Sequence, residues 1–289
     1  MHLIEALYEA GDLVNALTVC RMRICIALDY SRRSHECTSR DMPQFEDRSV
    51  SKTVVITQSN YIPWRGYFDM LRSADEVVLL ESVQYTRRDW RNRNRIKTAQ
   101  GTTWLTVPVE AKGHYLQAID ETRIIDAQWA TKHIRTIEAA YSRAPHYDEL
   151  APWLFDLLRR VSAEPLLTKV NEQLLRALCE RLGITVPIRR CSDVLDRSAL
   201  RSMRPTERLL AISTELGSTR YLSGPSARDY LDIGLFEAAG IEVSWMSYDG
   251  YPHYSQLWGI FEPHVSIVDL LLNTGPEAPR YLERKPLTV

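Results

Sequence analysis

One arrangement recurs three times in the second half of the sequence: a helical stretch, a glycine and then a short apolar run. A glycine just after a helix readily adopts the left-handed conformation that ends it, and the apolar run after it is predicted to be a strand. The glycines are Gly183, Gly217 and Gly240, and the runs are Ile184–Ile188, Arg220–Ser223 and Ile241–Trp245. Helices and strands that alternate in this way favour an α/β fold, a mainly parallel sheet with flanking helices.

The same alternation begins earlier, at Thr53. Thr53–Thr57 and Glu76–Leu80 are rich in β-branched and aliphatic residues and are predicted to be buried strands. A helix is expected between them, from about Gly66 to Ser73, so that this segment of about thirty residues forms a βαβ unit. The further predicted elements are a strand at Thr103–Val109 and helices at Asp126–Arg143 (with Asp126 as N-cap), Asp148–Val161, Glu164–Leu182 and Ser266–Asn273.

The composition limits the setting of the protein. A chain of 289 residues can bury a proper core, and its formal net charge of -1 gives no overall attraction to nucleic acid or a membrane. The five cysteines include no Cys-x-x-Cys pair, which argues against a disulfide framework or a structural zinc site and fits a reducing cytosol. No stretch is long and apolar enough to span a membrane, so we expect a cytoplasmic protein.

The first 52 residues differ from the rest of the chain. Apolar residues recur at helical spacing over 1–30, whereas 31–52 is polar and poor in apolar residues, which is typical of a linker. Met42 is a candidate for the true start of the protein, and the residues before it are then a mispredicted extension. We therefore predict an N-terminal helix and linker over 1–52 and an α/β domain over 53–289.

The segment Gln58–Phe68 follows the first predicted strand and opens a helix. Ligands of open α/β sheets bind beyond the carboxyl ends of the strands, and the free N–H groups at the start of a helix attract anions. Trp64 offers a flat surface either to a ligand or to the core. The polar candidates for orienting a ligand are Gln58, Asn60 and Tyr61, and the candidates for proton transfer are Tyr61 and Tyr67.

The segment from Gln84 to Lys97 is strongly basic. It holds six cationic side chains against one acid, Asp89, and so carries a local charge of +5. If its second half is extended, the arginines share one face and the asparagines the other. Several arginines on one face suit the recognition of phosphate or carboxylate, although a solvated or salt-bridged sheet edge is the alternative. The candidate ligand-binding residues are Gln84, Arg87, Arg88, Arg91, Asn92, Arg93, Asn94 and Lys97.

Three further places carry side chains suited to chemistry. His133 shares a helix face with aromatic residues and is either a general base or a buried core histidine. Ser223 and Ser226 lie where a strand gives way to a helix, a turn suited to anions, although Ser226 is equally suited to be a simple N-cap. Asp269 either lines the site or ties down the loop before its helix. No phosphate-loop, dinucleotide or zinc-protease motif is present, no metal ligands are indicated, and the cofactor is left open.

Five separated motifs connect the chain to a known family. They are Gln58-Ser-Asn-Tyr-Ile-Pro-Trp-Arg-Gly-Tyr-Phe68, Val83-Gln-Tyr-Thr-Arg-Arg-Asp-Trp-Arg-Asn-Arg-Asn-Arg-Ile-Lys97, Trp104-Leu-Thr-Val-Pro108, Tyr221-Leu-Ser-Gly-Pro-Ser226 and the stretch from Tyr254 to Asn273. With these motifs the chain resembles the WbqC-like family over roughly residues 53–282, although Ser59 stands where the family usually has proline. The resemblance implies a role in O-antigen or other surface-polysaccharide biosynthesis, with group transfer to amino sugars, including glycine transfer.

The start of the domain is also similar to the HUP-type nucleotide-binding fold of pantothenate synthetase and its relatives. A strand, a loop with proline and aromatic residues, a helix and a second strand follow one another in both, which implies a Rossmann-like start. Those enzymes carry histidines in the loop, whereas this chain has Trp64 and Tyr67 there. The difference argues against nucleotidyl transfer.

The leading prediction is a group transferase with a phosphorylated or nucleotide-linked substrate, whose anion the arginines clamp. One alternative is an RNA-binding protein that takes its acyl group from an aminoacyl-tRNA. Arginines interleaved with Tyr85 and Trp90 suit the phosphate contacts and base stacking that RNA binding needs. Another alternative is a non-catalytic scaffold of a biosynthetic complex. The donor, the acceptor and the oligomeric state stay open.

Overall fold

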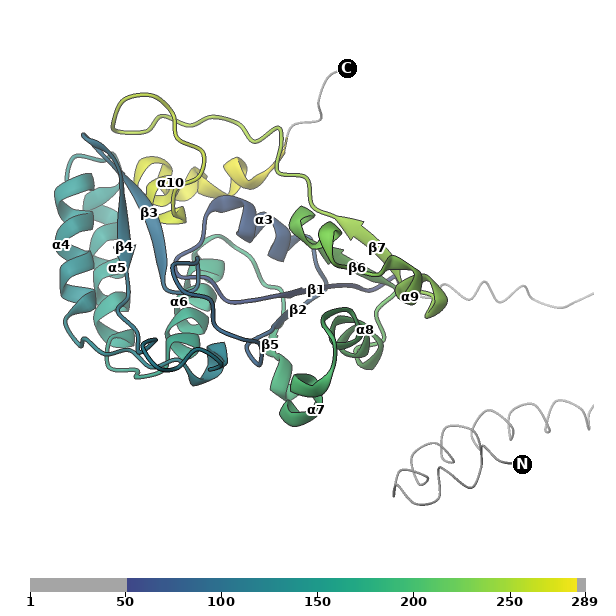
Figure 1. Ribbon diagram of the computed structural model, residues 1–289. Helices are drawn as coiled ribbons and strands as arrows, with labels where there is room; N and C mark the ends of the chain where they lie inside the picture. Colours follow the sequence, from purple (N-terminus) through teal and green to yellow (C-terminus); the bar gives the residue numbers. More distant parts are fainter. Residues whose placement is uncertain (1–50, 285–289) are drawn as a thin grey trace, which may run out of the picture. The chain divides into compact units, whose positions relative to one another are not determined.

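A five-stranded parallel sheet organises residues 51–284, the part of the chain that the computed structural model describes (Figure 1). The helix predicted over 1–30 and the linker up to residue 50 lie outside the described residues. The strands of this sheet are β1 (Thr53–Thr57), β2 (Glu76–Leu79), β5 (Ile188–Arg190), β6 (Arg220–Ser223) and β7 (Glu242–Trp245). The predicted α/β fold with a mainly parallel sheet is confirmed.

The order of the strands reverses beside β1. Across the sheet the order is β5-β2-β1-β6-β7, so the chain builds outward on one side of β1 and then crosses to the other side. In open α/β sheets, ligands bind at such a reversal, beyond the carboxyl ends of the two strands that meet there. The Rossmann-like start stays a prediction, because a strand order by itself does not identify a fold family.

Each face of the sheet packs against its own group of helices. Val55 and Val77 point into an apolar core formed with α3, α4, α5, α6 and α10. Their neighbours Val54 and Val78 point the other way, into a core formed with α7, α8 and α9. Strands buried on both faces are rich in apolar residues, and the runs Val54–Ile56 and Val77–Leu79 in β1 and β2 are wholly apolar. The helices are α3 (Arg65–Arg72), α4 (Trp129–Tyr141), α5 (Tyr147–Val161), α6 (Leu167–Arg181), α7 (Arg197–Ser202), α8 (Pro205–Glu215), α9 (Ile233–Ala238) and α10 (Ile267–Thr274).

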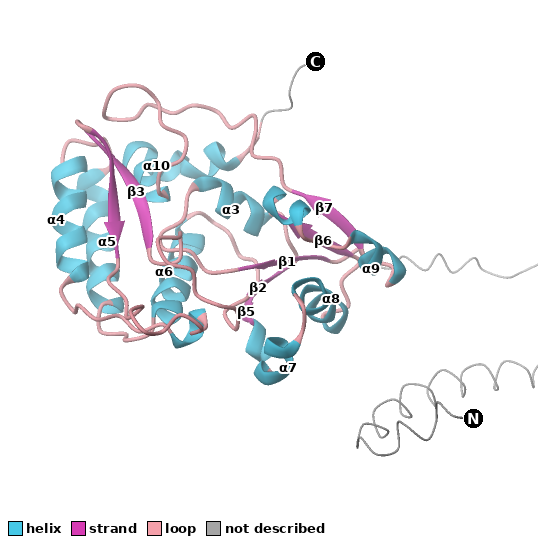
Figure 2. Cartoon of the chain, in the orientation of Figure 1, coloured by secondary structure: helices cyan, strands magenta, loops and turns pink. Residues whose placement is uncertain are grey.

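An antiparallel hairpin stands apart from the parallel sheet and packs beside α4 and α10 (Figure 2). It consists of β3 (Arg93–Thr98) and β4 (Gly101–Thr106). The strand predicted at 103–109 is therefore the second arm of this hairpin, displaced toward the N-terminus. Along β3 the predicted alternation is present in part: Asn94 and Ile96 are buried, and Arg93 and Arg95 are partly exposed.

The glycine after each of the three helices has the expected left-handed conformation. The φ angles are 69° at Gly183, 62° at Gly217 and 74° at Gly240. The strand after the first glycine is shorter than predicted and begins only at Ile188. Pro187 has no N–H to donate, and the residues between the glycine and Pro187 lead from the helix end to the strand without pairing in the sheet.

The other predicted helices are present with shifted ends. The stretches predicted at 126–143, 148–161, 164–182 and 266–273 form α4, α5, α6 and α10. Asp126 is not the N-cap of α4, because Gln128 occupies that position and the Asp126 carboxylate accepts its N–H at 2.8 Å. Among residues 51–284, no helix has both the length and the apolar character needed to cross a membrane.

Candidate functional site

A hollow of about 310 Å³ opens at the carboxyl ends of β1 and β6, where the strand order reverses. The loops that leave these two strands both contribute to its lining. We call it the switch-point pocket; its volume is near the lower limit of small-molecule sites, which hold roughly 300–1,000 Å³. The residues predicted from the sequence that line it are Gln58, Asn60, Trp64, Tyr67, Arg91, Ser223 and Ser226.

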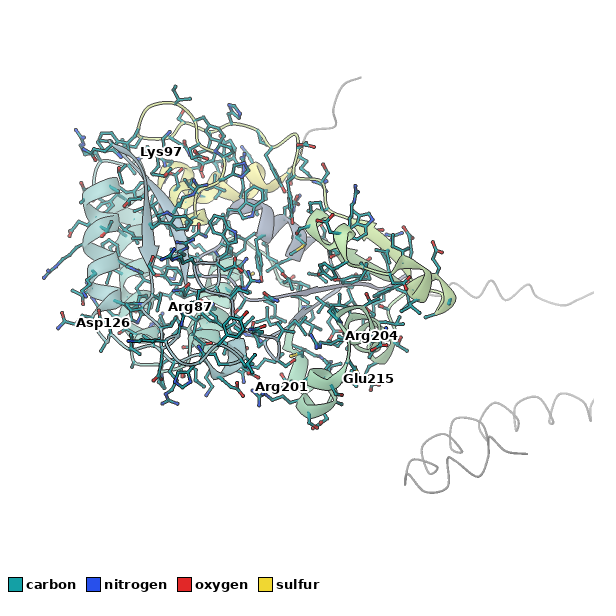
Figure 3. The ribbon with its side chains drawn as sticks, viewed as in Figure 1. Arg87, Lys97, Asp126, Arg201, Arg204 and Glu215 are labelled. Atoms are coloured by element: carbon teal, nitrogen blue, oxygen red, sulfur yellow. The ribbon has the colours of Figure 1, made fainter. Side chains whose placement is uncertain are left out.

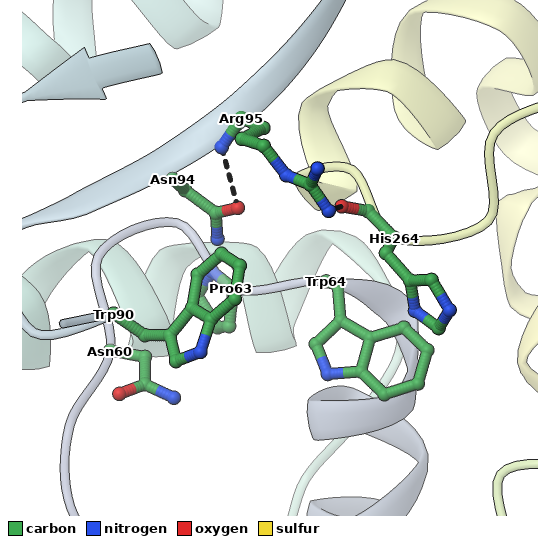
Figure 4. A pocket seen from close by; sticks show the side chains of 7 residues that line it. All are labelled: Asn60, Pro63, Trp64, Trp90, Asn94, Arg95 and His264. Atoms are coloured by element: carbon green, nitrogen blue, oxygen red, sulfur yellow. Dashed lines mark hydrogen bonds between the residues drawn. The ribbon is translucent and has the colours of Figure 1, made fainter. Parts of the chain in front are cut away.

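A second hollow of about 290 Å³ adjoins the first and is called here the side pocket (Figure 4). Asn60, Trp64 and Trp90 line both hollows, so one elongated ligand can contact both. The remaining lining residues of the side pocket are Pro63, Asn94, Arg95 and His264. The two hollows together form the candidate site.

Buried groups hold the loop after β1 from behind. Glu81 Oε1 accepts the N–H of Ser59 at 2.9 Å, and the Tyr67 hydroxyl donates to the carbonyl of Gln58 at 2.9 Å. Burial raises the pKa of the Glu81 carboxyl, and the Ser59 N–H opposes that rise. The fixed backbone directs Asn60 to the junction of the two hollows, where its Oδ1 is buried without a hydrogen-bond partner. Because buried acceptors are nearly always paired, this oxygen is available to a donor on a ligand.

The same loop contains a strained residue. Ile62 has a φ of 35°, a region that β-branched side chains rarely adopt. Its carbonyl accepts hydrogen bonds from Asn94 Nδ2 at 2.9 Å and from Ser266 Oγ at 2.7 Å. Asn94 Nδ2 also lies 3.1 Å from the carbonyl of Tyr61. Asn94 therefore borders the side pocket but acts first on the loop, whose strained shape it helps to hold.

The Trp64 indole separates the two hollows. It lies over Gly66, where an added Cβ would come within 2.4 Å of Trp64 Cζ2, so the indole takes this place only because residue 66 lacks a side chain. Tyr248 and His264, from the segment between β7 and α10, pack against the indole with ring centroids 5.1 and 5.2 Å away. Trp64 is thus a partly exposed wall of the site rather than a core residue.

Arg91 is the predicted cation that reaches the switch-point pocket. Its side chain is 17% exposed and forms an ion pair of 3.1 Å with Asp89, which also accepts the Thr86 hydroxyl at 2.6 Å. Arg91 Nε is buried without a partner. A guanidinium carries five N–H donors, so the ion pair leaves donors for a phosphate or carboxylate.

The predicted clamp of several arginines and a lysine is wrong, because the other predicted cations do not gather around the pocket. Arg87 donates to the carbonyl of Ala111, and the Arg93 guanidinium stacks 4.1 Å from the ring centre of Trp104. Arg87 and Lys97 lie well apart (Figure 3). The run is extended from Arg93 onward and rises about 3.3 Å per residue there, so the cations from Arg87 to Lys97 are spread out and do not all converge on one anion. The remaining predicted residues of this segment that lie outside both hollows are Gln84, Arg88 and Asn92.

Lys97 and Asp269 belong to a buried network beneath the segment between β7 and α10. Lys97 Nζ donates to Gln256 Oε1 at 2.7 Å. Asp269 accepts the hydroxyls of Tyr141 and Tyr254, each at 2.7 Å, and Gln256 Nε2 at 2.8 Å. Burial raises the pKa of the Asp269 carboxyl, and these three donors oppose that rise. Asp269 thus ties down the loop, which is one of its two predicted roles, and neither residue lines a hollow.

Tyr61 and His133 form a buried pair. The Tyr61 hydroxyl lies 2.8 Å from His133 Nδ1, and His133 Nε2 lies 3.1 Å from the carbonyl of Thr106. Because a carbonyl only accepts, Nε2 carries the hydrogen and Nδ1 accepts from the tyrosine. Burial lowers the pKa of His133 to about 4. Their burial contradicts the catalytic roles predicted for both residues, and His133 is the core histidine of the alternative reading.

Tyr67 is placed differently from this pair. Its ring lines the switch-point pocket, but its hydroxyl is engaged by the carbonyl of Gln58. Burial raises the pKa of the Tyr67 hydroxyl. A phenol that stays protonated and hydrogen-bonds to the backbone is poorly suited to proton transfer. The structure therefore favours Tyr67 as a wall of the pocket over its predicted catalytic role.

The turn after β6 brings two serines to the pocket. Ser223 is buried and accepts the Tyr221 hydroxyl at 3.2 Å, and Ser226 is exposed. The N-cap of the next element is Gly224, and that element is the short 3₁₀ helix η3 (Pro225–Asp229). The N-cap role predicted for Ser226 is therefore wrong, and both serines line the switch-point pocket.

Tyr248 and His264 line the site but were not singled out from the sequence. Both come from the long segment between β7 and α10, which has no periodicity to show where it folds. Trp90 and Arg95 lie in the basic segment, where Trp90 was considered for base stacking and Arg95 was counted among the arginines of one face, although neither was a candidate ligand-binding residue. Within residues 51–284, no group of three or more His, Cys, Asp and Glu side chains is arranged to hold a metal ion.

Comparisons with known proteins agree with the motifs of the site. The family described as the WbqC-like protein family matches residues 58–281. An uncharacterized protein of Mycobacterium tuberculosis is 48% identical over 231 residues, which cover 80% of this chain and 97% of that protein. No solved structure is significantly similar to the chain.

Proposed function

The chain belongs to the WbqC-like protein family, and from that premise we propose that it is a group transferase whose phosphorylated or nucleotide-linked substrate binds in the switch-point pocket. The group transferred is an acyl or aminoacyl group, such as glycyl. The acceptor is the amine of an amino sugar or a related compound in surface-polysaccharide biosynthesis. The proposed setting is the cytoplasm, where the buried, unpaired Cys179 and Cys191 would stay reduced.

The position and lining of the switch-point pocket carry this proposal. The pocket lies at the reversal of a parallel sheet, and Arg91, Ser223 and Ser226 offer hydrogen-bond donors to an anion there. The unpaired Oδ1 of Asn60 offers an acceptor at the junction with the side pocket. The site therefore places hydrogen-bond donors for an anion beside an acceptor for a neutral polar group. Such a site suits a substrate that carries both an anion and a neutral polar group. Gln58, Trp64 and Asn94 complete the proposed binding residues.

The side pocket contains a candidate proton acceptor, His264, whereas His133 is buried and does not line either hollow. His264 lines this pocket, and imidazole is the side chain that exchanges protons most readily near neutral pH. In the proposed reaction the acceptor amine attacks the acyl carbonyl and a new amide bond forms. The bond to the donor's leaving group breaks, and that group departs with the electron pair. His264 takes the proton of the amine and returns it to the leaving group.

A tryptophan fluorescence titration tests the proposal, since Trp64 and Trp90 line the site and report on its occupancy. The ligand panel comprises nucleotides, nucleotide sugars, acyl-CoA and aminoacyl-tRNA. Arg91→Ala should weaken binding of the ligand found by about 1–3 kcal/mol, the cost of losing a charged hydrogen-bond partner. Arg87→Ala, from the same segment but outside both hollows, is the matched control and should bind as the wild type does. Equal affinities for wild type and Arg91→Ala would reject the pocket, and no binding to any ligand favours the scaffold alternative.

A further inference from the structure

Two guanidiniums of the β3–β4 hairpin alternate with two indoles, one from the hairpin and one from the turn before it. Arg95 lies opposite Trp104 in the register of the strands, and Arg93, two residues earlier, is on the same face. The Arg93 guanidinium stands 4.1 Å from the ring centre of Trp104, and that of Arg95 stands 5.7 Å from it. The ring of Trp90 packs against that of Trp104 with centroids 5.5 Å apart. We call these four residues the Arg–Trp ladder.

Both indoles of the ladder are open to solvent. Trp90 is 40% exposed and Trp104 is 43% exposed, and neither belongs to the two apolar cores. Single exposed apolar residues are common on protein surfaces, but large aromatic side chains grouped on one face mark binding surfaces. The packing of the domain therefore does not explain why Trp90 and Trp104 lie together at the surface. Binding of a flat ligand to the two rings does explain it.

The ladder also holds two positive charges close together. Among residues 51–284, no carboxylate lies within ion-pair distance of Arg93 or Arg95, whereas Arg91, which precedes them in the chain, is paired with Asp89. Arg93 donates to the carbonyl of Arg88 and Arg95 to that of His264, while the Nε atoms of both are buried without a partner. Two guanidiniums over one ring repel each other, and an anion between them relieves that repulsion. Their unused N–H donors are suited to phosphate.

The ladder is continuous with the candidate site. Trp90 and Arg95 line the side pocket, and Trp90 also lines the switch-point pocket. The unpaired Oδ1 of Asn60 lies where the two hollows meet. A ligand seated on the ladder can therefore extend past Asn60 into the switch-point pocket without leaving the protein surface.

We propose that the Arg–Trp ladder binds a nucleoside phosphate, as one part of the substrate whose other part occupies the switch-point pocket. The base stacks on the exposed indoles, and the phosphate takes the free N–H donors of Arg93 and Arg95. A sugar alone would use the indoles but not the two charges, and inorganic phosphate alone would use the charges but not the indoles. A nucleoside phosphate uses both. This inference rests on the proposed function and names the substrate class of that site.

Isothermal titration of the full chain with UDP, ADP and inorganic pyrophosphate tests the ladder. Trp104→Ala and Arg93→Gln alter the ladder without touching the lining of either hollow. Each should weaken binding of the two nucleoside diphosphates by about tenfold or more. Pyrophosphate has no base, so Trp104→Ala should leave its binding unchanged. The matched control is Arg143→Gln, because Arg143 is also an exposed arginine over an indole, 4.8 Å from the ring centre of Trp258, and it is expected to have no effect.

The outcomes separate the ladder from the pocket. Nucleoside diphosphates that bind Trp104→Ala and Arg93→Gln as they bind the wild type overturn the ladder. If Arg91→Ala still weakens that binding, the switch-point pocket stands. Binding that none of the three variants weakens overturns both. A short single-stranded RNA distinguishes the source of the nucleotide: an affinity far above that of ADP, which falls steeply across about 50–200 mM salt, assigns the ladder to an RNA end. Comparable affinities with little salt dependence assign it to a free or small-molecule-linked nucleotide.

Discussion

The side-chain amide of Asn94 donates to the carbonyl of Ile62 at 2.9 Å and so connects the β3–β4 hairpin to the loop after β1. Ile62 is one of the two non-glycine residues with positive φ within residues 51–284, the other being Arg88. The hairpin therefore does more than carry exposed arginines. Asn94 on its buried face fixes the loop that presents Asn60 to the candidate site.

Asn94→Ala should remove this support and weaken ligand binding as well as stability. Buried carbonyls at Tyr61 and Ile62 lose a donor, at a cost of about 1–3 kcal/mol in the free energy of unfolding. Asn92→Ala is the matched control, since Asn92 is also buried and its amide donates to the backbone of Val107. It should lose similar stability and keep its affinity for ligand. The measurements are denaturant unfolding and ligand titration, and equal losses of affinity in both variants would contradict a special role for Asn94.

Gly66→Ala should displace the Trp64 indole from the wall between the two hollows. The added methyl group would meet Trp64 Cζ2 at 2.4 Å, a distance that requires the ring to move. We expect a shift in the tryptophan emission spectrum and weaker ligand binding. Gly234→Ala serves as control, because its new Cβ would meet Asp232 Oδ1 at an ordinary distance of 3.4 Å in α9. Unchanged emission and affinity in Gly66→Ala would show that the indole does not form this wall.

His133 should make the protein less stable as the pH falls from about 6.5 toward 4. The folded state holds the imidazole neutral, with a pKa lowered to about 4, whereas the unfolded chain takes up the proton near the ordinary value of 6.5. The contribution of His133 to the free energy of unfolding is fully present above pH 6.5 and is lost as the pH falls to about 4. Since a tenfold change in proton affinity corresponds to about 1.4 kcal/mol, the loss reaches roughly 3 kcal/mol.

Urea unfolding at several pH values measures this loss. His133→Gln should lack the corresponding part of the pH dependence. Tyr61→Phe, which keeps the imidazole and removes only its hydroxyl partner, should retain it. Parallel pH profiles for the wild type and His133→Gln would show that another group causes the acid sensitivity.

Lys97→Met should destabilise the protein rather than act directly on a ligand. The ammonium group is buried, donates to Gln256 Oε1 and Ile260, and lies near the buried Asp269. Breaking a buried charged contact costs about 3–5 kcal/mol. Arg87→Met, on the exposed part of the same basic segment, is the control and should change stability little. A stable Lys97→Met protein that has lost ligand binding would restore the phosphate clamp predicted from the sequence.

The sequence predicts the sheet and much of the site because both follow from local patterns. Gln58 and Asn60 are found because they directly follow β1, and Ser223 because it ends β6, at the edge where parallel sheets bind ligands. The roles of Lys97, Asp269 and His133 are not found in this way. Alternation along a strand shows which side chains share a face, but not which distant segment covers that face.

The segment between β7 and α10 decides the roles of Lys97 and Asp269. It buries Lys97 and Asp269 through Gln256, and it brings His264 to the side pocket. Because it has no hydrophobic period, its path is fixed by tertiary contacts, such as the Arg65 guanidinium stacked 4.8 Å from the ring centre of Tyr251. No pattern in the sequence marks these contacts in advance.

Hydrogen–deuterium exchange of the full chain, with and without the saturating ligand from the titrations, tests most directly that the switch-point pocket is the binding site. Bound ligand should slow exchange in the loop 58–64 and in the turn 223–228, which line the pocket after β1 and β6. Exchange should not change at residues 98–103 and 136–143, which line a separate hollow beside Trp258. Protection confined to that separate hollow, or absent from both loops of the pocket at saturation, would show that the ligand binds elsewhere.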